Sequence, residues 1–340
     1  MRESYKECRS SMKSLLSMSH WLRWGLTVSY GLLFLLGLIG STSVWAQSAQ
    51  VRTTSGTTSG PYGLADVVTE SIFGQSNPAN FTPLSLSYFG DGWLEPWIDP
   101  GTGSSGALRG GWVSTFSGFF SREIDPTYSF TSAESPGRDE HVGSLALLTP
   151  LSRRVEMSLS IPFVDSLQSG GGKPSETSFG DIVLTPKVML HETRDLSVST
   201  GVGLRTPSGA ERTGNGRTAV SPFLAFWQGL DDRWQVRGGI GADVLTQKHS
   251  TPDAVLRANL AVGTTLSSQG AAPLGNFTPY VSLNLYQNVG SGPDTTTFSV
   301  TPGIRTYLGW TTYFISGVEI PVTNPDPFEW RVTAVLSKGF

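Results

Sequence analysis

Cysteine, charge and long apolar runs are all scarce in this sequence, and each shortage narrows what the protein can be. The 340 residues include one cysteine, Cys8, and charged side chains make up 15% of the chain. The mean hydropathy of -0.08 does not fit a protein built from several membrane-spanning helices. The length and the 40 glycines instead suit one large all-β domain.

The first 46 residues differ from the rest of the chain. A basic front precedes the apolar run at 31–39, and Val44-Trp45-Ala46 follows. This order is typical of a secretory signal peptide, and we predict cleavage after Ala46. A single inner-membrane helix is the alternative, although the apolar run is short and is interrupted by Gly37. The length of the basic front also leaves Met12 and Met18 open as translation starts. The basic residues are Arg2, Lys6, Arg9, Lys13 and Arg23.

Removal of residues 1–46 changes both the charge and the cysteine content. It takes away five of the 24 basic and two of the 27 acidic residues, which leaves a net charge of about −6. An acidic balance argues against nucleic acid as a partner. Cys8 is lost as well, so the exported chain has neither a disulfide nor a thiol. Cys8 lies far from the predicted cleavage site, so we expect no lipid on it. Sheet hydrogen bonds and packing must then hold the fold, as in a closed barrel.

Residues 47–110 form a second region, which we predict to be a flexible, aromatic-containing periplasmic segment or a plug. Its start, 47–60, is rich in Ser, Thr and Gly and reads as a flexible lead. The remainder carries Phe81, Tyr88, Trp93 and Trp97 among residues that favour turns. So many aromatics in an irregular stretch suggest that it docks on the barrel mouth or enters the lumen, with a loosely ordered tail as the alternative.

From Trp112 onward the sequence divides into runs of strand length with no convincing helix between them. In one run Val281, Leu283 and Leu285 oppose Ser282 and Asn284. We predict an all-β fold, a transmembrane antiparallel β-barrel of about 12 strands (range 10–14), over residues 111–340. The runs are 112–121, 141–149, 154–163, 180–190, 196–206, 218–228, 233–245, 254–266, 277–289, 297–309, 311–320 and 328–340.

Connection lengths distinguish a membrane barrel from a soluble sandwich, which alternation alone cannot do. On one side the predicted connections span about 7–19 residues, and on the other side about 1–5, with 267–276 as the exception. Long loops outside and short turns inside are typical of outer-membrane barrels. The last run, 328–340, alternates over thirteen residues and stops on Phe340, as expected of a closing strand that pairs with the run beginning near Trp112.

The cost of a charge in lipid fixes which face of each strand points inward. An arginine or lysine on the lipid side would cost roughly 2–4 kcal/mol near the midplane, so these residues should face the lumen. Aromatics near strand ends should form the interfacial girdles: Trp112, Phe163, Trp234, Phe277, Trp310 and Trp330. The predicted lumen-lining residues are Lys187, Arg205, Arg237, Arg257, Arg305, Arg331, Asp181, Asp243, Glu319, Glu329, Asn259, Tyr280 and Asn284.

Three stretches resemble a known family of outer-membrane proteins. They are TPLSRRVEMSLSIPFV (149–164), FGDIVLTPKVMLHET (179–193) and TPGIRTYLGWTTYFISGVEIPVTNPDPFEW (301–330). The chain is similar here, and over roughly 112–340 as a whole, to the transporter-like family labelled "MetA-pathway of phenol degradation". The resemblance implies an outer-membrane barrel that passes small compounds, aromatic or otherwise poorly polar. It brings no catalytic residues, and residues 47–110 lie outside it.

The function that we expect is that of a passive outer-membrane channel for small solutes, with no enzyme activity and no cofactor. The lumenal charges could select a solute, or they could pair and brace a plugged barrel that is structural or adhesive. A lipid hydrolase is a further alternative, but His141 and Ser144 are three residues apart on one predicted strand and so face opposite ways. His141, His191 and His249 have no metal-ligand spacing.

Three glycines lie close together in one of the predicted strands. Gly238, Gly239 and Gly241 lie inside a strand, so they more plausibly relieve crowding within the barrel than bind a nucleotide. The expected partners are outer-membrane lipid, the barrel-assembly machinery acting on the strand that ends at Phe340, and a small solute.

Overall fold

The computed structural model describes residues 63–104, 106–132, 138–168, 176–210, 217–246, 253–271, 273–290, 295–323 and 328–340. These residues all belong to one unit, Gly60–Phe340. The predicted signal peptide and the Ser/Thr/Gly-rich lead lie outside the described residues.

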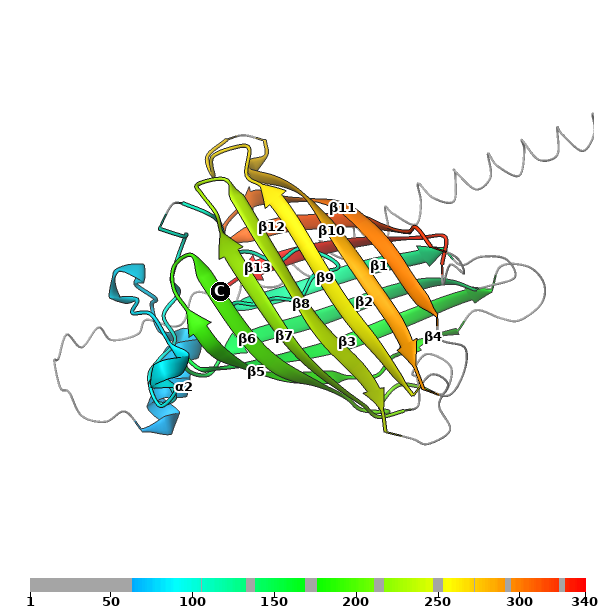
Figure 1. Cartoon of the computed structure of the whole chain (residues 1–340), viewed down its shortest axis with the longest axis horizontal. Coiled ribbons are helices and arrows are strands. Elements are labelled where there is room, and N and C mark those ends of the chain that lie inside the picture. Colours follow the sequence, from blue (N-terminus) through cyan, green and yellow to red (C-terminus); the bar gives the residue numbers. More distant parts are fainter. Residues whose placement is uncertain are drawn as a thin grey trace, which may run out of the picture. The chain divides into compact units, whose positions relative to one another are not determined.

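Within the described residues, thirteen strands pair antiparallel into one sheet that closes into a barrel (Figure 1). Closure comes from β1, which pairs with β2 on one side and with β13 on the other. β4 and β5 both pair with β3, along different parts of it, so together they fill one position of a twelve-stranded barrel. The predicted all-β antiparallel barrel is confirmed. The strands are β1 (Glu123–Ser132), β2 (Arg138–Pro150), β3 (Val155–Gln168), β4 (Glu176–Phe179), β5 (Val183–Glu192), β6 (Leu196–Arg205), β7 (Ala219–Gly229), β8 (Trp234–Leu245), β9 (Ala254–Thr264), β10 (Gly275–Val289), β11 (Thr296–Gly309), β12 (Thr312–Pro321) and β13 (Trp330–Gly339).

The two faces of the barrel wall differ as the alternation predicts. On β11, Thr297, Ser299 and Thr301 are at most 7% exposed, whereas Phe298 and Ile304 are 48% and 37% exposed. Polar residues therefore point into the lumen and apolar residues point outward. A one-residue slip in register would exchange these faces, so the pattern also fixes the register of the sheet.

The two ends of the barrel have different connections. At the turn end, where β1 begins and β13 finishes, 151–154, 193–195, 230–233 and 310–311 join successive strands, and only 265–274 is long. At the other end, called the loop end, the connections include 206–218 and 246–253. Lys338, which alternation places on the outer face, lies at the turn end and donates to the carbonyl of Trp310 and to Thr311 Oγ1 at 3.1 Å.

Residues 63–104 form a small helical cap at the turn end (Figure 1). It contains α2 (Leu64–Phe73) and the 3₁₀ helices η2 (Pro78–Asn80) and η3 (Leu86–Tyr88). The start of α2 is fixed by Asp66, whose Oδ2 accepts from the backbone N–H of Gly63 at 3.2 Å. None of the helices in the described ranges is long and apolar enough to cross a bilayer.

The first predicted strand, 112–121, is wrong. The structure places the first strand eleven residues later, at Glu123–Ser132, and β13 pairs with it in the register Glu123↔Gly339. Residues 112–121 pair with no strand, and they form a turn at Val113 and Ser114, where the φ of Ser114 is 56°. The first loop-end connection is therefore 133–137, not the long loop expected from the sequence.

Candidate functional site

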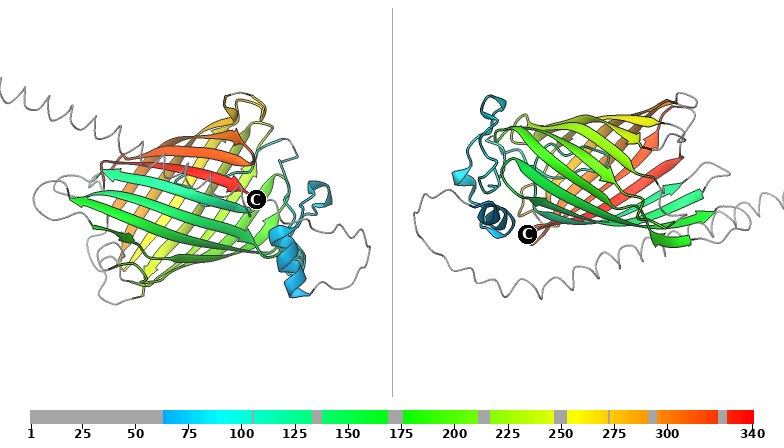
Figure 2. Two further views of the ribbon diagram at one scale, coloured as in Figure 1. Left: turned by 180° about the vertical axis from the view of Figure 1, so that it is seen from behind. Right: turned by 90° about the horizontal axis from the view of Figure 1, so that it is seen from below.

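The lumen of the barrel contains part of the chain itself. Residues 107–121, here called the luminal loop, enter from the turn end, reach the middle of the barrel and return to the start of β1 (Figure 2). Near the entrance Ala107 packs with Phe119 and Trp227. At the tip, Ser114 Oγ donates to Glu319 Oε2 of β12 at 3.4 Å. The loop leaves the lumen at Ser121, whose N–H donates to Glu156 Oε2 at 2.8 Å.

The ascending part of the luminal loop packs on β9, β10 and β12. The ring of Trp112 lies on that of Tyr280, with centroids 4.7 Å apart and planes inclined by 1°. The Tyr280 hydroxyl accepts from the N–H of Val113 at 3.0 Å and donates to the carbonyl of Ser316 at 3.3 Å. Trp112, predicted in an interfacial girdle, is 6% exposed and lies in the lumen. That girdle assignment is wrong for Trp112, whereas Trp234 and Trp310 are 46% and 89% exposed.

The descending part of the loop packs on β7, β8 and β5. Phe116 stacks on Phe223 with centroids 5.5 Å apart, and its N–H donates to Asn259 Oδ1 at 3.4 Å. Further down, Lys187 Nζ donates to the carbonyl of Phe119 at 2.7 Å. Two of the predicted lumen residues, Asn259 and Lys187, therefore bind the loop backbone.

Glycines in the barrel wall make room for the side chains of the luminal loop. A Cβ on Gly263 would lie 2.5 Å from Trp112, and one on Gly239 would lie 2.7 Å from Phe116. Both distances are shorter than van der Waals contact, so no larger residue fits without a shift. The prediction that glycines such as Gly239 relieve crowding inside the barrel is confirmed.

Several predicted lumenal charges are paired inside the barrel. Lys187 Nζ lies 2.7 Å from Glu156 Oε1, and Arg257 Nη2 lies 2.8 Å from Asp243 Oδ1. Arg331 Nη1 lies 3.4 Å from Glu319 Oε2 and completes the third pair. These contacts cross between neighbouring strands, so they fasten the wall as well as place charge in the lumen.

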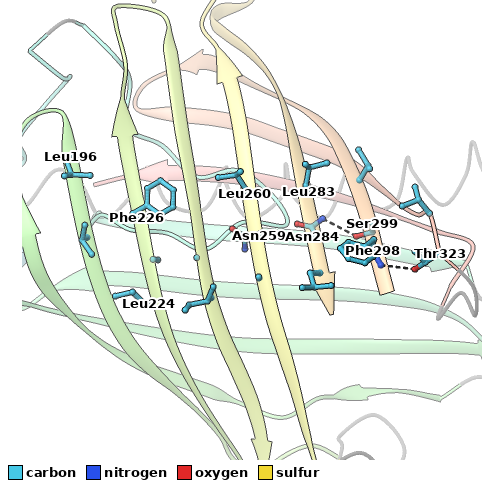
Figure 3. A pocket seen from close by; sticks show the side chains of 18 residues that line it. Leu196, Leu224, Phe226, Asn259, Leu260, Leu283, Asn284, Phe298, Ser299 and Thr323 are labelled. Carbon is cyan, nitrogen blue, oxygen red and sulfur yellow. Dashed lines mark hydrogen bonds between the residues drawn. The ribbon is translucent and has the colours of Figure 1, made fainter. Parts of the chain in front are cut away.

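A network of neutral polar groups continues from Glu319 along β10 and β11. Glu319 accepts from Ser299 Oγ at 2.6 Å and from Tyr286 Oη at 3.0 Å. Asn284 donates to Ser299 Oγ at 3.2 Å (Figure 3) and to Thr301 Oγ1 at 3.0 Å. Buried polar groups in a barrel need such partners, and this network supplies them.

Other predicted lumen residues lie apart from this network. At the loop end, Asp181 Oδ1 accepts from the N–H of Gly209 at 3.0 Å, and Glu329 Oε2 accepts from Ser132 Oγ at 3.1 Å. Arg205 is the last residue of β6. Arg237 and Arg305 lie nearer the turn end, 1% and 4% exposed.

A cavity of about 210 Å³ lies between the tip of the luminal loop and the wall. Its polar groups come from Arg257 and Asn259 of β9 and from Asn284 and Tyr286 of β10. Phe116 supplies an aromatic face, over which the Arg257 guanidinium lies 5.5 Å from the ring centroid. The site thus combines a charged pair, amides and an aromatic ring, a combination suited to a small organic molecule with polar substituents. The lining residues are Ser114, Thr115, Phe116, Arg257, Ala258, Asn259, Asn284 and Tyr286.

The outer face of the same wall is apolar. Phe226, Leu260, Leu283 and Phe298 line a shallow depression there, on the side opposite the Asn284 amide (Figure 3). Leu260, Leu283 and Phe298 are each about half exposed. A broad apolar surface of this kind is unusual on a water-soluble protein and suits contact with lipid.

Arginines that were not among the predicted site residues fasten the cap to the turn end. Arg154 is fully buried and donates to five backbone carbonyls, those of Ser85, Tyr88, Asp91, Met189 and Leu190. Burial lowers the pKa of the Arg154 guanidinium, and the adjacent charge of Arg153 lowers it further. Arg109 Nη1 lies 2.7 Å from Glu192 Oε1 and holds the entrance of the luminal loop. The sequence carried no clear signal of this role for Arg153 and Arg154, because charged residues are usual in solvent-exposed turns.

Two solved structures are similar to this chain, and the first of them supports the fold. The crystal structure of the COG4313 outer membrane channel from Pseudomonas putida F1 is similar, with a TM-score of 0.54 and 16% identity, covering 72% of this chain and 100% of that one. The KdgM porin matches with a TM-score of 0.42 and 10% identity, covering 64% of this chain and 99% of that one. A search of curated proteins found no match.

A family model matches most of the barrel. The family described as "Putative MetA-pathway of phenol degradation" matches residues 123–295, from the first residue of β1 to the residue before β11. These 173 residues are just over half of the 340, and they include two of the three stretches that carried the resemblance. The chain therefore belongs to this family.

Proposed function

We propose that the protein is an outer-membrane channel that passes small solutes by passive diffusion. The observation that carries this proposal is the contrast across the wall of a closed barrel, apolar outside and polar inside. Lipid would contact the outer face, whereas the lumenal amides, hydroxyls and charges would contact water and solute.

The proposal includes an export route and an orientation. The signal peptide would be removed after Ala46, and the strand that ends at Phe340 would be recognised by the barrel-assembly machinery. The turn end, where β1 begins and β13 finishes, would face the periplasm, because short turns lie on that side in outer-membrane barrels. The cap would then cover the periplasmic mouth.

In this proposal the luminal loop is the constriction of the channel. It crosses the lumen between β5, β7, β8, β9, β10 and β12, so any solute must pass beside it. The sequence predicts that 47–110 is a periplasmic segment or a plug. In this proposal its part at 63–104 would be a cap. Most of the constriction would be formed by 111–121, which follows the predicted segment. The barrel proper would start at Glu123.

The solute would be small and either aromatic or poorly polar. Phe116 offers a ring face in the cavity beside the tip of the luminal loop, while Arg257 and Asn259 offer polar contacts. Lys187 and Tyr280 are predicted lumen residues that bind the luminal loop. Most residues of this kind would hold the constriction in place. Arg257, Asn259 and Asn284 would contact the solute.

A barrel without an open pore, structural or adhesive in role, is the second candidate. It is favoured by the number of contacts that fasten the luminal loop, at both its entrance and its exit. Liposome swelling separates the two. We would compare the wild type, a variant lacking residues 47–104, and a variant in which 108–120 is replaced by a short Gly/Ser linker.

Each outcome of the swelling assay has a distinct meaning. Swelling of liposomes that contain the wild-type protein, in a solution of a small aromatic solute, supports an open channel. Swelling only after replacement of the luminal loop identifies the loop as a plug, and swelling only without residues 47–104 assigns closure to the cap. Absence of swelling in all three, with folded protein verified by heat-modified mobility on gels, would refute the channel.

A lipid hydrolase finds no support in the described part of the chain. His141 pairs with Phe130 on the outer face, whereas Ser144 pairs with Thr127 on the lumenal face. The two side chains therefore cannot act together, as the sequence predicted. Phospholipid hydrolysis by the purified protein, compared with His141→Ala, would test this directly, and we expect none.

A further inference from the structure

Most hydrogen-bond donors that line the cavity beside the tip of the luminal loop already have acceptors within the protein. Ser114 Oγ and Tyr286 Oη both donate to Glu319, at 3.4 and 3.0 Å. Thr115 Oγ1 donates to the carbonyl of Trp112 at 2.9 Å. A hydroxyl has a single proton, so none of these three groups can donate to a solute without losing its present hydrogen bond.

The two amide side chains of the cavity differ in this respect. Asn284 Nδ2 donates both of its protons, one to Ser299 Oγ and one to Thr301 Oγ1. Asn259 uses its oxygen, which accepts from the N–H of Phe116 at 3.4 Å. The described residues supply no acceptor for Asn259 Nδ2, so both of its protons can be donated to a solute.

Arg257 is the second source of uncommitted donors. Its Nη2 lies 2.8 Å from Asp243 Oδ1, the one hydrogen-bond acceptor that the described part of the chain gives this guanidinium, and its side chain is 36% exposed. Its Nε has no partner among the same residues. Arg257 and Asn259 are two residues apart on β9, so their side chains leave the same face of the strand, from Cα atoms about 7 Å apart. This edge of the cavity is therefore rich in donors.

The charges around the cavity are balanced. Arg257 faces Asp243, and Arg331 Nη1 lies 3.4 Å from Glu319 Oε2. An anionic solute would gain from the two cations but would also approach two carboxylates, and the reverse holds for a cationic solute. The arrangement therefore favours an uncharged solute whose polar atom accepts hydrogen bonds.

The rest of the lining sets the size and the apolar part of the solute. Phe116 and Ala258 face the cavity, whose volume is about 210 Å³. Protein cavities of about 150 Å³ accommodate benzene. A single six-membered ring with a short polar substituent therefore fits.

We propose that the cavity selects uncharged single-ring carbonyl compounds. The ring would lie beside Phe116 and Ala258, and the carbonyl oxygen would accept from Asn259 Nδ2 and from the Arg257 guanidinium. This inference rests on the proposed channel function and narrows its solute from any small aromatic compound to one that accepts hydrogen bonds. A ring without an acceptor would displace water from these donors and leave them without partners, which disfavours its binding.

Matched bromoarenes test the selection in crystals of the wild-type protein, because the anomalous scattering of bromine locates each compound. The probes are para-bromoacetophenone, which carries a carbonyl, para-bromoethylbenzene, which lacks one, para-bromobenzoate and para-bromobenzylamine. We expect para-bromoacetophenone in the cavity, with its oxygen within hydrogen-bonding distance of Asn259 Nδ2. At the same concentration the other three should be absent from it. Absence of para-bromoacetophenone, or equal occupancy by para-bromoethylbenzene, would overturn the proposal.

Asn259→Asp tests the donor in solution. Aspartate keeps an oxygen that can accept from the N–H of Phe116, but it replaces the Nδ2 donor with a second oxygen. Affinity for para-bromoacetophenone, measured by calorimetric titration in detergent, should fall about fivefold, the effect of one hydrogen bond. Affinity for the cationic para-bromobenzylamine should rise. Asn80→Asp, at an exposed position of η2 in the cap, makes the same change of charge away from the cavity and should keep the wild-type affinities.

Neither measurement needs a conducting pore, so a failure of this inference is distinguishable from a failure of the channel. Unchanged affinities in a folded Asn259→Asp protein would overturn the carbonyl selection and leave the channel proposal intact. Absence of swelling in every variant, together with bound para-bromoacetophenone, would instead refute the channel and support a carbonyl-binding site in a closed barrel. If Asn259→Asp does not fold, the crystals of the wild-type protein decide.

Discussion

Trp112 and Tyr280 lie face to face, with ring centroids 4.7 Å apart and ring planes inclined by 1°. Trp112 belongs to the luminal loop and Tyr280 to the wall, so this stack joins the loop to the barrel. Val113, Ala261 and Ile315 complete a small apolar cluster around it. This apolar cluster lies inside an otherwise polar lumen. It holds the loop through the burial of apolar surface, as in the core of a soluble protein.

Removal of the Trp112 ring should therefore widen the lumen. Trp112→Ala deletes a side chain that is 6% exposed, and such deletions cost about 3–5 kcal/mol in a packed core. We expect a lower unfolding temperature and a larger single-channel conductance in planar bilayers. Tyr280→Phe is the control, since it keeps the stacked ring and removes only the hydroxyl. Wild-type conductance in a folded Trp112→Ala protein would show that the loop does not limit the current.

The close packing of Trp112 against Gly263 can be tested by combining substitutions at the two positions. A Cβ on Gly263 would lie 2.5 Å from Cη2 of Trp112, so Gly263→Ala should destabilise the barrel by about 1–3 kcal/mol. In the Trp112→Ala background the same change should cost less, because the opposing ring is gone and only the close approach to Tyr280 Cβ at 2.9 Å remains. Gly270→Ala is the matched control, as nothing lies within 4 Å of a Cβ there. Additive effects of the two substitutions on the unfolding temperature would contradict this contact.

Alternation in the sequence was enough to predict most of the barrel. Ser282 and Asn284 are buried in the lumen while Val281 and Leu283 are exposed outside, as expected. Lys187, for which the cost of charge in lipid predicts an inward face, is 4% exposed. The physical reason is that lipid disfavours polar and charged side chains on the outer face of a strand. Apolar and polar residues must therefore alternate along the sequence of each strand.

The luminal loop could not be predicted in the same way. Trp112, Phe116 and Phe119 are apolar residues in a stretch of strand length, and the sequence does not reveal whether lipid or lumen covers them. The loop is recognisable only when Gly263 and Gly239 are seen to face it. Glu156 was missed as a partner of Lys187 because the pairing depends on the β3–β5 register, in which the two residues are directly opposite.

The ion pair between Glu156 and Lys187 should control the exit of the luminal loop. Glu156 accepts from the N–H of Ser121, and Lys187 donates to the carbonyl of Phe119. Glu156→Gln leaves a buried ammonium without its counter-charge, which should cost about 3–5 kcal/mol. Amide hydrogen exchange at residues 119–121 should become faster.

A double variant separates stability from the fastening of the loop. Replacing both partners by apolar residues, as in Glu156→Leu with Lys187→Met, is expected to restore most of the stability because no unpaired charge remains. Exchange at residues 119–121 should nevertheless stay fast, since both contacts to the loop are lost. Slow exchange in the double variant would mean that other contacts hold the exit of the loop.

Arg257 should influence which ions pass the constriction. It lines the cavity above the luminal loop and lies 2.8 Å from Asp243, with both side chains partly exposed. Arg257→Ala would leave the Asp243 carboxylate without a cation, so the local potential should become negative and cations should be favoured. The reversal potential across a planar bilayer with a potassium chloride gradient measures this preference. Arg233→Ala, in an exposed turn where the side chain is 68% exposed, is the control and should leave the reversal potential unchanged. A reversal potential in Arg257→Ala equal to that of the wild type would place the conducting path away from Arg257 and Asp243.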